Sequence, residues 1–209
     1  MKIGCVILAG GKSSRMGTDK ALLEYDGKQF IQQITEELSQ FEERIIARGT
    51  NRGFSAEIEA AWTVIPDLYP DHGPIGGLHA ALTACESDAL FVVTCDMPLF
   101  SRELAERLCA QMQNGEGLET DTDGKHVDAY DVIISVDHNG KVHPLCGVYR
   151  KSVLPVLEEQ ILSDRNRVME ALRNLRVNYI AIDSPDQERQ LANINTPQEY
   201  EALNDKIRK

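Results

Sequence analysis

The sequence predicts a three-layer, Rossmann-like α/β fold in which helices cover both faces of a mostly parallel sheet. Apolar runs such as residues 3–8 and 90–95 have the length and composition of strands that are buried on both faces. Helical patterns separate these runs, as right-handed β-α-β connections require. A turn-rich segment, residues 137–140, joins two later strand patterns and predicts at least one antiparallel strand.

Strand and helix patterns alternate through the first half of the chain. The predicted strands are residues 3–8, 44–48, 62–65 and 90–95. After the first strand, apolar residues recur at helical spacing, which predicts an amphipathic helix with one face formed by Phe30, Ile34, Leu38 and Phe41. A second helix is expected with Pro74 as its first residue, and Ser101 is expected to cap a third over residues 102–112.

The second half begins with residues 114–129, a polar and acidic segment that is expected to be an exposed excursion. Its predicted strands are 130–136, 142–149 and 177–182, and its helices are 152–161 and 167–175. Near the end, Thr196 and Glu199 have the spacing of a capping box, with Pro197 at the first helical position.

Length and composition exclude several classes of protein. The 209 residues suit a single domain, and the net charge of −11 argues against a nucleic-acid surface or an anionic membrane. No run of about twenty apolar residues predicts a membrane span. The five cysteines are odd in number and lack C-x-x-C spacing, so we expect reduced, mostly buried thiols and a cytoplasmic protein.

Residues 6–20, VILAGGKSSRMGTDK, have the chemistry of a polyphosphate-binding loop. The glycines at 10 and 11 let backbone N–H groups approach a ligand, and Lys12, Arg15 and Lys20 supply three cations. A Walker A loop is excluded, because Val6 stands where its first glycine is required. The G-x-G-x-x-G spacing of a dinucleotide loop is also missing.

Asp96 follows an apolar strand, at the edge of the sheet where open α/β folds bind ligands. A buried, unpaired carboxylate there is costly, so a cation is the natural partner of Asp96. The histidines show no metal-binding spacing, and we expect them on loops or the surface, with His143 as the one substrate contact: His72, His79, His126, His138 and His143.

Four segments of this chain resemble the molybdenum cofactor guanylyltransferases. The first is the loop with Leu8-Ala9-Gly10-Gly11, Arg15-Met16-Gly17 and Asp19-Lys20. The others are Asp67 with the GPIGG loop at 73–77, the CDMP segment at Asp96, and the NINTP segment at 193–197. The order and approximate spacing match over nearly the whole chain, so the resemblance implies a nucleotidyltransferase fold.

The resemblance also implies roles for individual residues. Residues 1–100 would bind the nucleotide, and residues 101–209 would lie mainly on the substrate side. The implied nucleotide contacts are Leu8, Ala9, Gly10, Gly11, Lys20, Asn51, Asp67 and Asp96; Arg15, Lys20 and Asp96 would be catalytic, and Asp96 would hold Mg²⁺. The implied substrate contacts are Gly73, Pro74, Gly76, Gly77, His143, Asn193 and Asn195. At the end of the second strand, counting without gaps offers Arg48 in place of Asn51.

The reaction that the resemblance implies is transfer of GMP from GTP to the terminal phosphate of molybdopterin, with release of pyrophosphate. Its partners would be GTP and molybdopterin, with transient contacts to proteins that deliver or accept the cofactor. An alternative is a cytidylyl- or uridylyltransferase that acts on another phosphorylated small molecule. A second alternative, from a different class, is a nucleotide-binding regulator without turnover.

Overall fold

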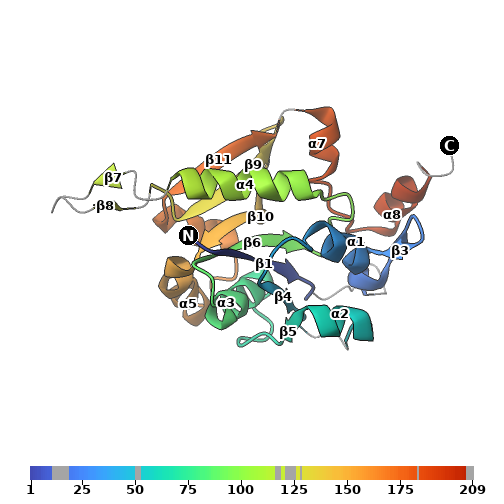
Figure 1. Cartoon of the computed structure of the whole chain (residues 1–209), viewed down its shortest axis with the longest axis horizontal. Helices are drawn as coiled ribbons and strands as arrows, with labels where there is room; N and C mark the ends of the chain where they lie inside the picture. The colour runs from blue at the N-terminus through green and yellow to red at the C-terminus, as the bar shows by residue number, and fades with distance from the viewer. Residues whose placement is uncertain are drawn as a thin grey trace.

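The computed structural model describes residues 1–10, 19–49, 53–115, 119–120, 126–127, 129–182 and 184–205. Its centre is a seven-stranded sheet with the order β11-β9-β10-β6-β1-β4-β5 (Figure 1). The strands in chain order are β1 (Ile3–Leu8), β4 (Arg44–Ala47), β5 (Thr63–Ile65), β6 (Ala89–Thr94), β9 (Val132–Asp137), β10 (Val142–Arg150) and β11 (Val177–Ile182).

Only one of these seven strands runs against the others. β10 pairs antiparallel with both β6 and β9, whereas the remaining pairs are parallel. The mostly parallel sheet with an antiparallel strand is therefore confirmed. The sheet is continuous from strands of the first half of the chain to strands of the second. β1, β4 and β6 of the first half end at its carboxyl edge, and β9 and β11 of the second half run in the same direction.

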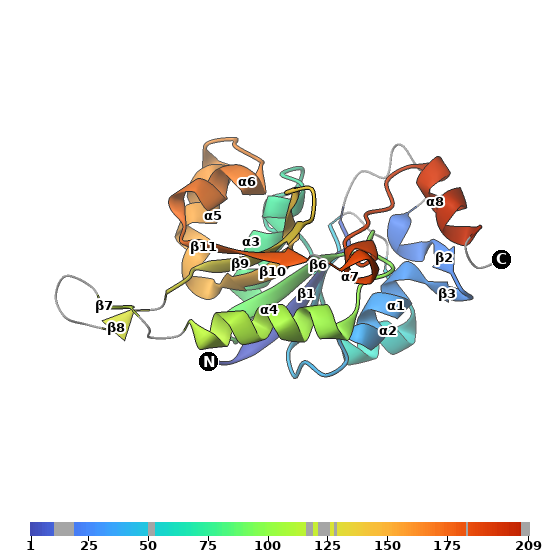
Figure 2. The same cartoon turned by 90° about the horizontal axis from the view of Figure 1, so that it is seen from above.

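Helices cover both faces of the sheet, which gives the three predicted layers (Figure 2). On one face lie α1 (Phe30–Glu37), α2 (Ala56–Ala61) and α4 (Arg102–Asn114), and on the other lie α3 (Pro74–Ala84), α5 (Leu154–Leu162) and α6 (Val168–Ala171). Ser101 accepts a hydrogen bond from the Leu104 N–H at 3.4 Å and thus caps α4 as predicted.

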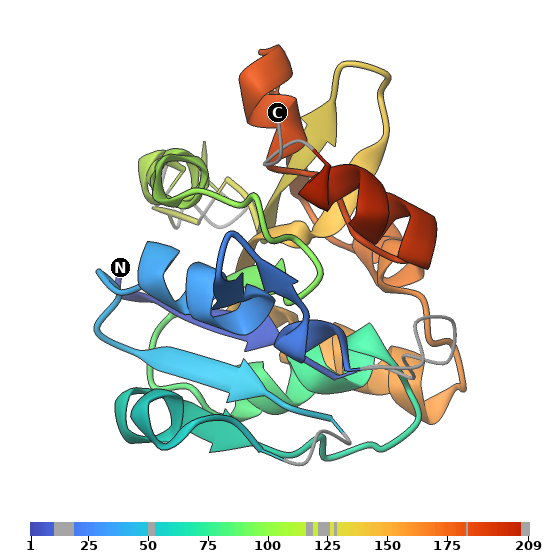
Figure 3. The same ribbon diagram turned by 90° about the vertical axis from the view of Figure 1, so that its right-hand side faces the viewer.

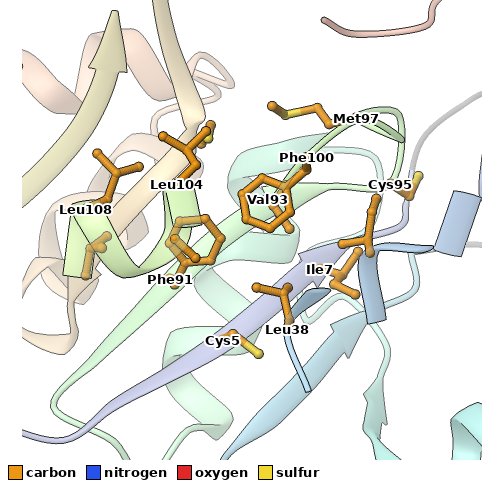
Figure 4. Packing of buried hydrophobic residues seen from close by; sticks show 14 of the residues in the cluster. Cys5, Ile7, Leu38, Phe91, Val93, Cys95, Met97, Phe100, Leu104 and Leu108 are labelled. Atoms are coloured by element: carbon orange, nitrogen blue, oxygen red, sulfur yellow. The ribbon is translucent and has the colours of Figure 1, made fainter. Parts of the chain in front are cut away.

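The core between the sheet and the first set of helices is built on aromatic and aliphatic contacts. Figure 4 shows Phe91 and Val93 of β6 among Leu104 and Leu108 of α4. Phe91 also packs against Phe100, with ring centroids 5.4 Å apart. Burying several large apolar side chains at roughly 25 cal/mol per Å² of apolar surface supplies much of the driving force for folding. The core fixes the strand ends to which the candidate site is attached.

Several details differ from the predicted elements. α1 ends at Glu37, so Phe41 lies beyond the helix, where its ring stacks on Phe91 at 6.1 Å. The pattern at 167–175 is not one helix but α6 followed by a 3-10 turn. Three short elements were not predicted, because each has few buried residues and therefore a weak apolar pattern. They are the hairpin of β2 (Glu24–Tyr25) and β3 (Lys28–Gln29), the helix α2, and α7 (Pro185–Arg189).

The last helix, α8 (Pro197–Asn204), packs against the β2–β3 hairpin (Figures 1 and 2). Figure 3 views the molecule from the side toward which β1 points, and α8 lies in its foreground. The predicted capping box is present, because Thr196 and Glu199 accept and donate reciprocally at its first turn. The Tyr200 hydroxyl donates to the Glu24 carbonyl at 2.7 Å, and its ring lies 6.0 Å from Phe30. These contacts fix the preceding segment, residues 193–196.

The cysteines are free, as predicted, and all except Cys109 are buried. Burial raises the pKa of Cys85 to about 11 and that of Cys146 to about 12, so both are unreactive thiols at neutral pH. Within the described ranges, none of the helices combines the length and apolar character that crossing a membrane requires.

Candidate active site

The candidate site begins where three parallel strands end together. In the register of the sheet, Leu8 lies opposite Ala47 on one side and Thr94 on the other. The Ala9 N–H donates to the Ala47 carbonyl at 2.9 Å, and the Cys95 N–H donates to the Leu8 carbonyl at 3.1 Å. Sheet pairing thus brings the segments after β1, β4 and β6 to one edge, as expected for a ligand site in an open α/β sheet.

Asp96 is held at this edge by donors from distant parts of the chain. Its Oδ1 atom accepts hydrogen bonds from the Thr94 hydroxyl at 2.6 Å and from the Asn193 amide at 2.8 Å. Its Oδ2 atom lies 3.2 Å from the Nζ atom of Lys20. The Asp96 carbonyl also accepts from the Ile194 N–H at 2.8 Å. The carboxylate therefore has a fixed orientation, with one oxygen fully engaged and the other facing a cation.

Lys20 is the cation in this contact, and its side chain is only 19% exposed. It is the first residue of a 3-10 turn whose N-cap, Asp19, accepts from the Ala21 N–H at 3.0 Å. Its ammonium also donates to the Asn195 Oδ1 atom at 2.6 Å. The Asn195 N–H in turn donates to Glu199 at 2.7 Å, so the capping box of α8 positions the partner of Lys20. A partly desolvated ammonium with fixed acceptors is suited to hold phosphate oxygens.

A cavity of about 170 Å³ opens at this cluster. It is lined by Leu8, Ala9, Gly10, Asp19, Lys20, Pro74, Thr94, Cys95, Asp96, Leu145 and Asn193. A larger hollow, about 560 Å³, lies between the β2–β3 hairpin and α8, but its charged lining residues are the carboxylates Glu24, Asp26, Glu201 and Asp205. Such a lining repels a polyphosphate, so the smaller cavity at Lys20 and Asp96 is the candidate site.

Gly10 and Gly49 let the segments after β1 and β4 touch backbone to backbone. A Cβ atom on Gly49 would lie 2.6 Å from the Gly10 Cα atom, and one on Gly10 would lie 2.9 Å from the Gly49 Cα atom. Gly49 also has a φ of +55°, in the left-handed region that favours glycine. Packing therefore requires glycine at both positions, independently of any contact that Gly10 makes with a ligand.

Asp67 follows β5 and lies beside Gly49 and Gly77. Burial raises the pKa of its carboxyl group, while a hydrogen bond from the Gly49 N–H acts in the opposite direction. Its Oδ1 atom is buried and has no hydrogen-bond partner among the residues that the structure describes. An unmatched buried acceptor calls for an explanation, and a donor group on a ligand would supply one.

The GPIGG loop divides into an exposed start and a buried first helical turn. Gly73 is the N-cap of α3 with a φ of +62°, and Pro74 is its first residue, as predicted. Pro74 lines the cavity. Gly76 and Gly77 are buried in the helix, and a Cβ atom on Gly76 would lie 2.8 Å from the Tyr69 carbonyl oxygen. Close packing thus accounts for Gly76, whereas a Cβ atom on Gly77 would come no nearer than 3.4 Å to its neighbours. The predicted substrate contacts of both glycines stay a prediction.

The expectation of surface histidines is wrong for His79 and His143. His79 is 6% exposed in α3, and its ring packs edge-on against Tyr69 at 5.2 Å. Buried helical faces surround it, because α3 is enclosed between the sheet and α5. His143 is 7% exposed on β10, with its Nε2 atom 3.4 Å from Asp137, and burial lowers its pKa. His143 does not line the cavity, so its substrate contact stays a prediction.

The structure adds two residues that the sequence analysis missed. Thr94 and Leu145 both line the cavity. Thr94 is two residues before Asp96, the spacing that places side chains on one face of a strand, and this signal was available in the sequence. Leu145 lies where the register between β9 and β10 is irregular, between residues 143 and 147. Sequence patterns do not reveal such an irregularity, so the position of Leu145 could not be predicted.

Three predicted residues, Gly11, Arg15 and Asn51, lie outside the described residues. Arg48, the alternative to Asn51, extends the pairing of β4 with β5, because its N–H donates to the Ile65 carbonyl at 3.0 Å. Asn193 contacts Asp96 and Asn195 contacts Lys20. The predicted substrate contacts of both asparagines stay predictions.

The Asp96 carboxylate fits the coordination of a magnesium ion whose other ligands would come from the substrate and from water. In the described ranges, no three His, Cys, Asp or Glu side chains are grouped as a protein-only metal site. Mg²⁺ commonly takes one or two carboxylates together with phosphate oxygens and water. Asp96 offers one oriented carboxylate, of which the Oδ2 atom already faces a positive charge.

Comparisons with known proteins agree with this geometry. Residues 5–190 match the family model of the MobA-like NTP transferase domain. A probable molybdenum cofactor guanylyltransferase of Clostridium perfringens is 31% identical over 210 residues, which cover 97% of this chain and 96% of the relative.

Two solved structures share the fold. The molybdopterin-guanine dinucleotide biosynthesis protein A of Archaeoglobus fulgidus has a TM-score of 0.75 and 24% identity, with 100% of this chain and 99% of that chain covered. The 2-C-methyl-D-erythritol 4-phosphate cytidylyltransferase of Thermus thermophilus has a TM-score of 0.67 and 13% identity, with 98% of both chains covered. The fold is therefore that of nucleotidyltransferases, but it does not by itself select the base.

Gly49→Ala tests the backbone contact at the site. Both this variant and the control Gly140→Ala add a Cβ atom at positive φ, which costs about 1–2 kcal/mol of stability. Only Gly49→Ala also creates a clash, because nothing lies within 4 Å of the new atom at Gly140. We expect an additional loss of about 1–3 kcal/mol in urea unfolding. Equal losses in the two variants would contradict the close contact.

Asp67→Asn tests the burial of the Asp67 carboxylate. A raised pKa means that folding disfavours the ionised form, so the destabilisation is present at pH 7 and disappears as the pH falls toward the unfolded value of about 3.9. We expect the ligand-free variant to unfold at a higher temperature than wild type at pH 7, with a smaller advantage at pH 5. Glu201→Gln, at an exposed position, is the control. A variant less stable than wild type at both pH values would refute this reading.

Proposed function

Because the chain belongs to the MobA-like NTP transferase domain family, we propose that it transfers GMP from GTP to the terminal phosphate of molybdopterin and releases pyrophosphate. The observation that carries the proposal is the cluster of Lys20, Asp96, Asn193 and Asn195 at the cavity. The name of the Clostridium perfringens relative supports the choice of guanine and of the molybdenum cofactor.

The attacking group needs no general base from the protein. The second pKa of a phosphate monoester is near 6, so the terminal phosphate of the acceptor is largely ionised at pH 7. Among the described residues that line the cavity there is no histidine, which is compatible with the reaction. What the site must do is hold two anions in line and compensate the charge that develops on the leaving pyrophosphate.

Lys20 would hold the phosphates of the nucleotide. An ammonium has three N–H donors, of which two are directed to Asp96 and Asn195 in this structure. A phosphate oxygen can take the third, or can replace Asp96 as the partner. The negatively charged protein, with a net charge of −11, repels a free triphosphate, so such local cations decide where it binds.

Asp96 would hold Mg²⁺, which when bound supplies charge neutralisation and polarisation at the phosphates. The task of the protein is to orient this carboxylate, and Thr94 and Asn193 do so through its Oδ1 atom. We also propose that the unmatched Asp67 acceptor receives a donor from the guanosine, since it lies beside the Gly49 backbone near the same edge.

A cytidylyltransferase is the second candidate, because an enzyme of that activity shares the fold with a TM-score of 0.67. A regulator without turnover is a weaker alternative, because it would not require an oriented carboxylate beside a lysine. We propose the cytoplasm as the location, since buried free thiols are typical of reducing compartments.

Product formation tests the proposal directly. The protein is incubated with molybdopterin and Mg²⁺ and with GTP, CTP, UTP or ATP, and the dinucleotide product is identified by mass spectrometry. We expect the guanine dinucleotide and pyrophosphate with GTP. GTP should also raise the melting temperature most, by the equivalent of about 2.7 kcal/mol at one hundred times its Kd. A preference for CTP in both assays would replace the guanylyl assignment.

Lys20→Met and Asp96→Asn test the charged pair. Each removes a group that acts on phosphate charge, so we expect a loss of at least about 10²-fold in turnover with the fold retained. Lys28→Met is the matched control, because Lys28 forms a comparable ion pair with Glu36 at an exposed position, 2.6 Å apart. Turnover of Lys20→Met equal to that of the control would remove Lys20 from the mechanism.

A further inference from the structure

The Thr94 hydroxyl donates a hydrogen bond to the Asp96 Oδ1 atom at 2.6 Å. This is the shortest of the hydrogen bonds that Asp96 makes with the described residues. Thr94 is the last residue of β6, and its side chain lines the cavity. The Asn193 amide contacts both members of the pair, at 2.8 Å from the Asp96 Oδ1 atom and 3.5 Å from the Thr94 hydroxyl. These three side chains form one connected network.

From this network we infer that Thr94 is a positioning residue for the reaction, which acts by fixing Asp96 so that only Oδ2 is open to a cation. The inference rests on the proposed function, because it assumes that Asp96 receives the metal ion that accompanies the nucleotide. Thr94 itself does not need to touch the metal or the substrate.

The number of acceptor positions on Asp96 supports this role. A carboxylate oxygen has two lone pairs, and Oδ1 accepts from Thr94 and from Asn193, so its acceptor capacity is used. Oδ2 lies 3.2 Å from Lys20, which is its one cationic partner in the described part of the chain. The same position can receive a metal ion when Lys20 moves to a phosphate. Without the hydroxyl, Oδ1 keeps only the Asn193 amide as a donor, so the carboxylate is oriented less firmly.

The hydroxyl has no evident task in the fold. Thr94 is paired with Leu8 through the backbone register of β6 and β1, which any β-branched residue maintains. The Met97 N–H donates to the Thr94 carbonyl at 3.3 Å, and this turn also needs only the backbone. Valine has nearly the shape of threonine, so its substitution removes the hydrogen bond with little change in packing.

The test measures metal binding without turnover. Mn²⁺ is titrated by electron paramagnetic resonance into protein loaded with a non-hydrolysable GTP analogue, in the absence of acceptor. We expect Thr94→Val to weaken Mn²⁺ binding by roughly 10- to 100-fold, as is typical for loss of a group that orients a metal ligand. Thr94→Ser keeps the hydroxyl and should bind Mn²⁺ nearly as wild type does. Affinity for the analogue in EDTA should be unchanged in both variants.

Controls separate this inference from the proposed function. Thr83→Val removes a hydroxyl that donates to the His79 carbonyl in α3, away from the cavity, and should leave Mn²⁺ binding unchanged. If Thr94→Val melts below the assay temperature, Thr94→Ala is used for the same titration. Wild-type affinity in a folded hydroxyl-free variant would overturn the role of Thr94 alone. Failure of the wild-type protein to bind Mn²⁺ with the analogue would overturn the metal role and this inference together.

Discussion

The candidate site depends on one constraint, a carboxylate fixed at the end of a buried strand. Asp96 cannot be left there without partners, because an uncompensated charge in a partly buried position is strongly destabilising. Its partners come from residues 76 and 97 positions away in the chain, Lys20 and Asn193. Folding must therefore bring Lys20 and the C-terminal segment around Asn193 together at Asp96 before the site exists. The same contacts serve stability in the free protein and orientation when substrates bind.

The C-terminal helix extends this constraint beyond the cavity. α8 contributes no side chain to the lining of the cavity, yet its capping residue Glu199 accepts the Asn195 N–H, and Asn195 holds Lys20. Tyr200 fastens the same helix to the β2–β3 hairpin. A local feature of helix geometry thus controls a side chain in the site. α8 therefore contributes to the site although it lies outside the sheet.

Two further features of this edge are a close backbone contact and an unmatched buried acceptor. Gly10 and Gly49 meet without side chains, and a buried oxygen of Asp67 lacks a partner among the residues described. Packing alone accounts for the two glycines. The Asp67 acceptor is different, because a donor group on a ligand would complete its hydrogen bonding. The burial that raises the pKa of Asp67 disfavours its ionised form and so lowers the stability of the ligand-free protein at neutral pH.

Most of the fold was determined by patterns that can be read in the sequence. The strands at residues 3–8 and 177–182 and the caps at Ser101 and Thr196 follow from local apolar spacing and local hydrogen bonds, so they were predicted within a residue or two. Lys20 and Asp96 were also recognisable, since their residue types and neighbours resemble a known family. Gly11, Arg15 and Asn51 lie outside the described residues, and their roles stay predictions.

Tertiary structure decided what local patterns cannot contain. The burial of His79 depends on α5 covering α3, and the burial of Gly76 depends on its contact with Tyr69, both of which are long-range or loop contacts. The bond from Thr94 to Asp96 is local, but its importance emerges only when Asn193 completes the network. The sequence alone determined which chemical groups are present and on which elements they lie. The packing of distant segments determined which oxygen of Asp96 is occupied and which one faces Lys20, because that choice requires donors from three parts of the chain at once.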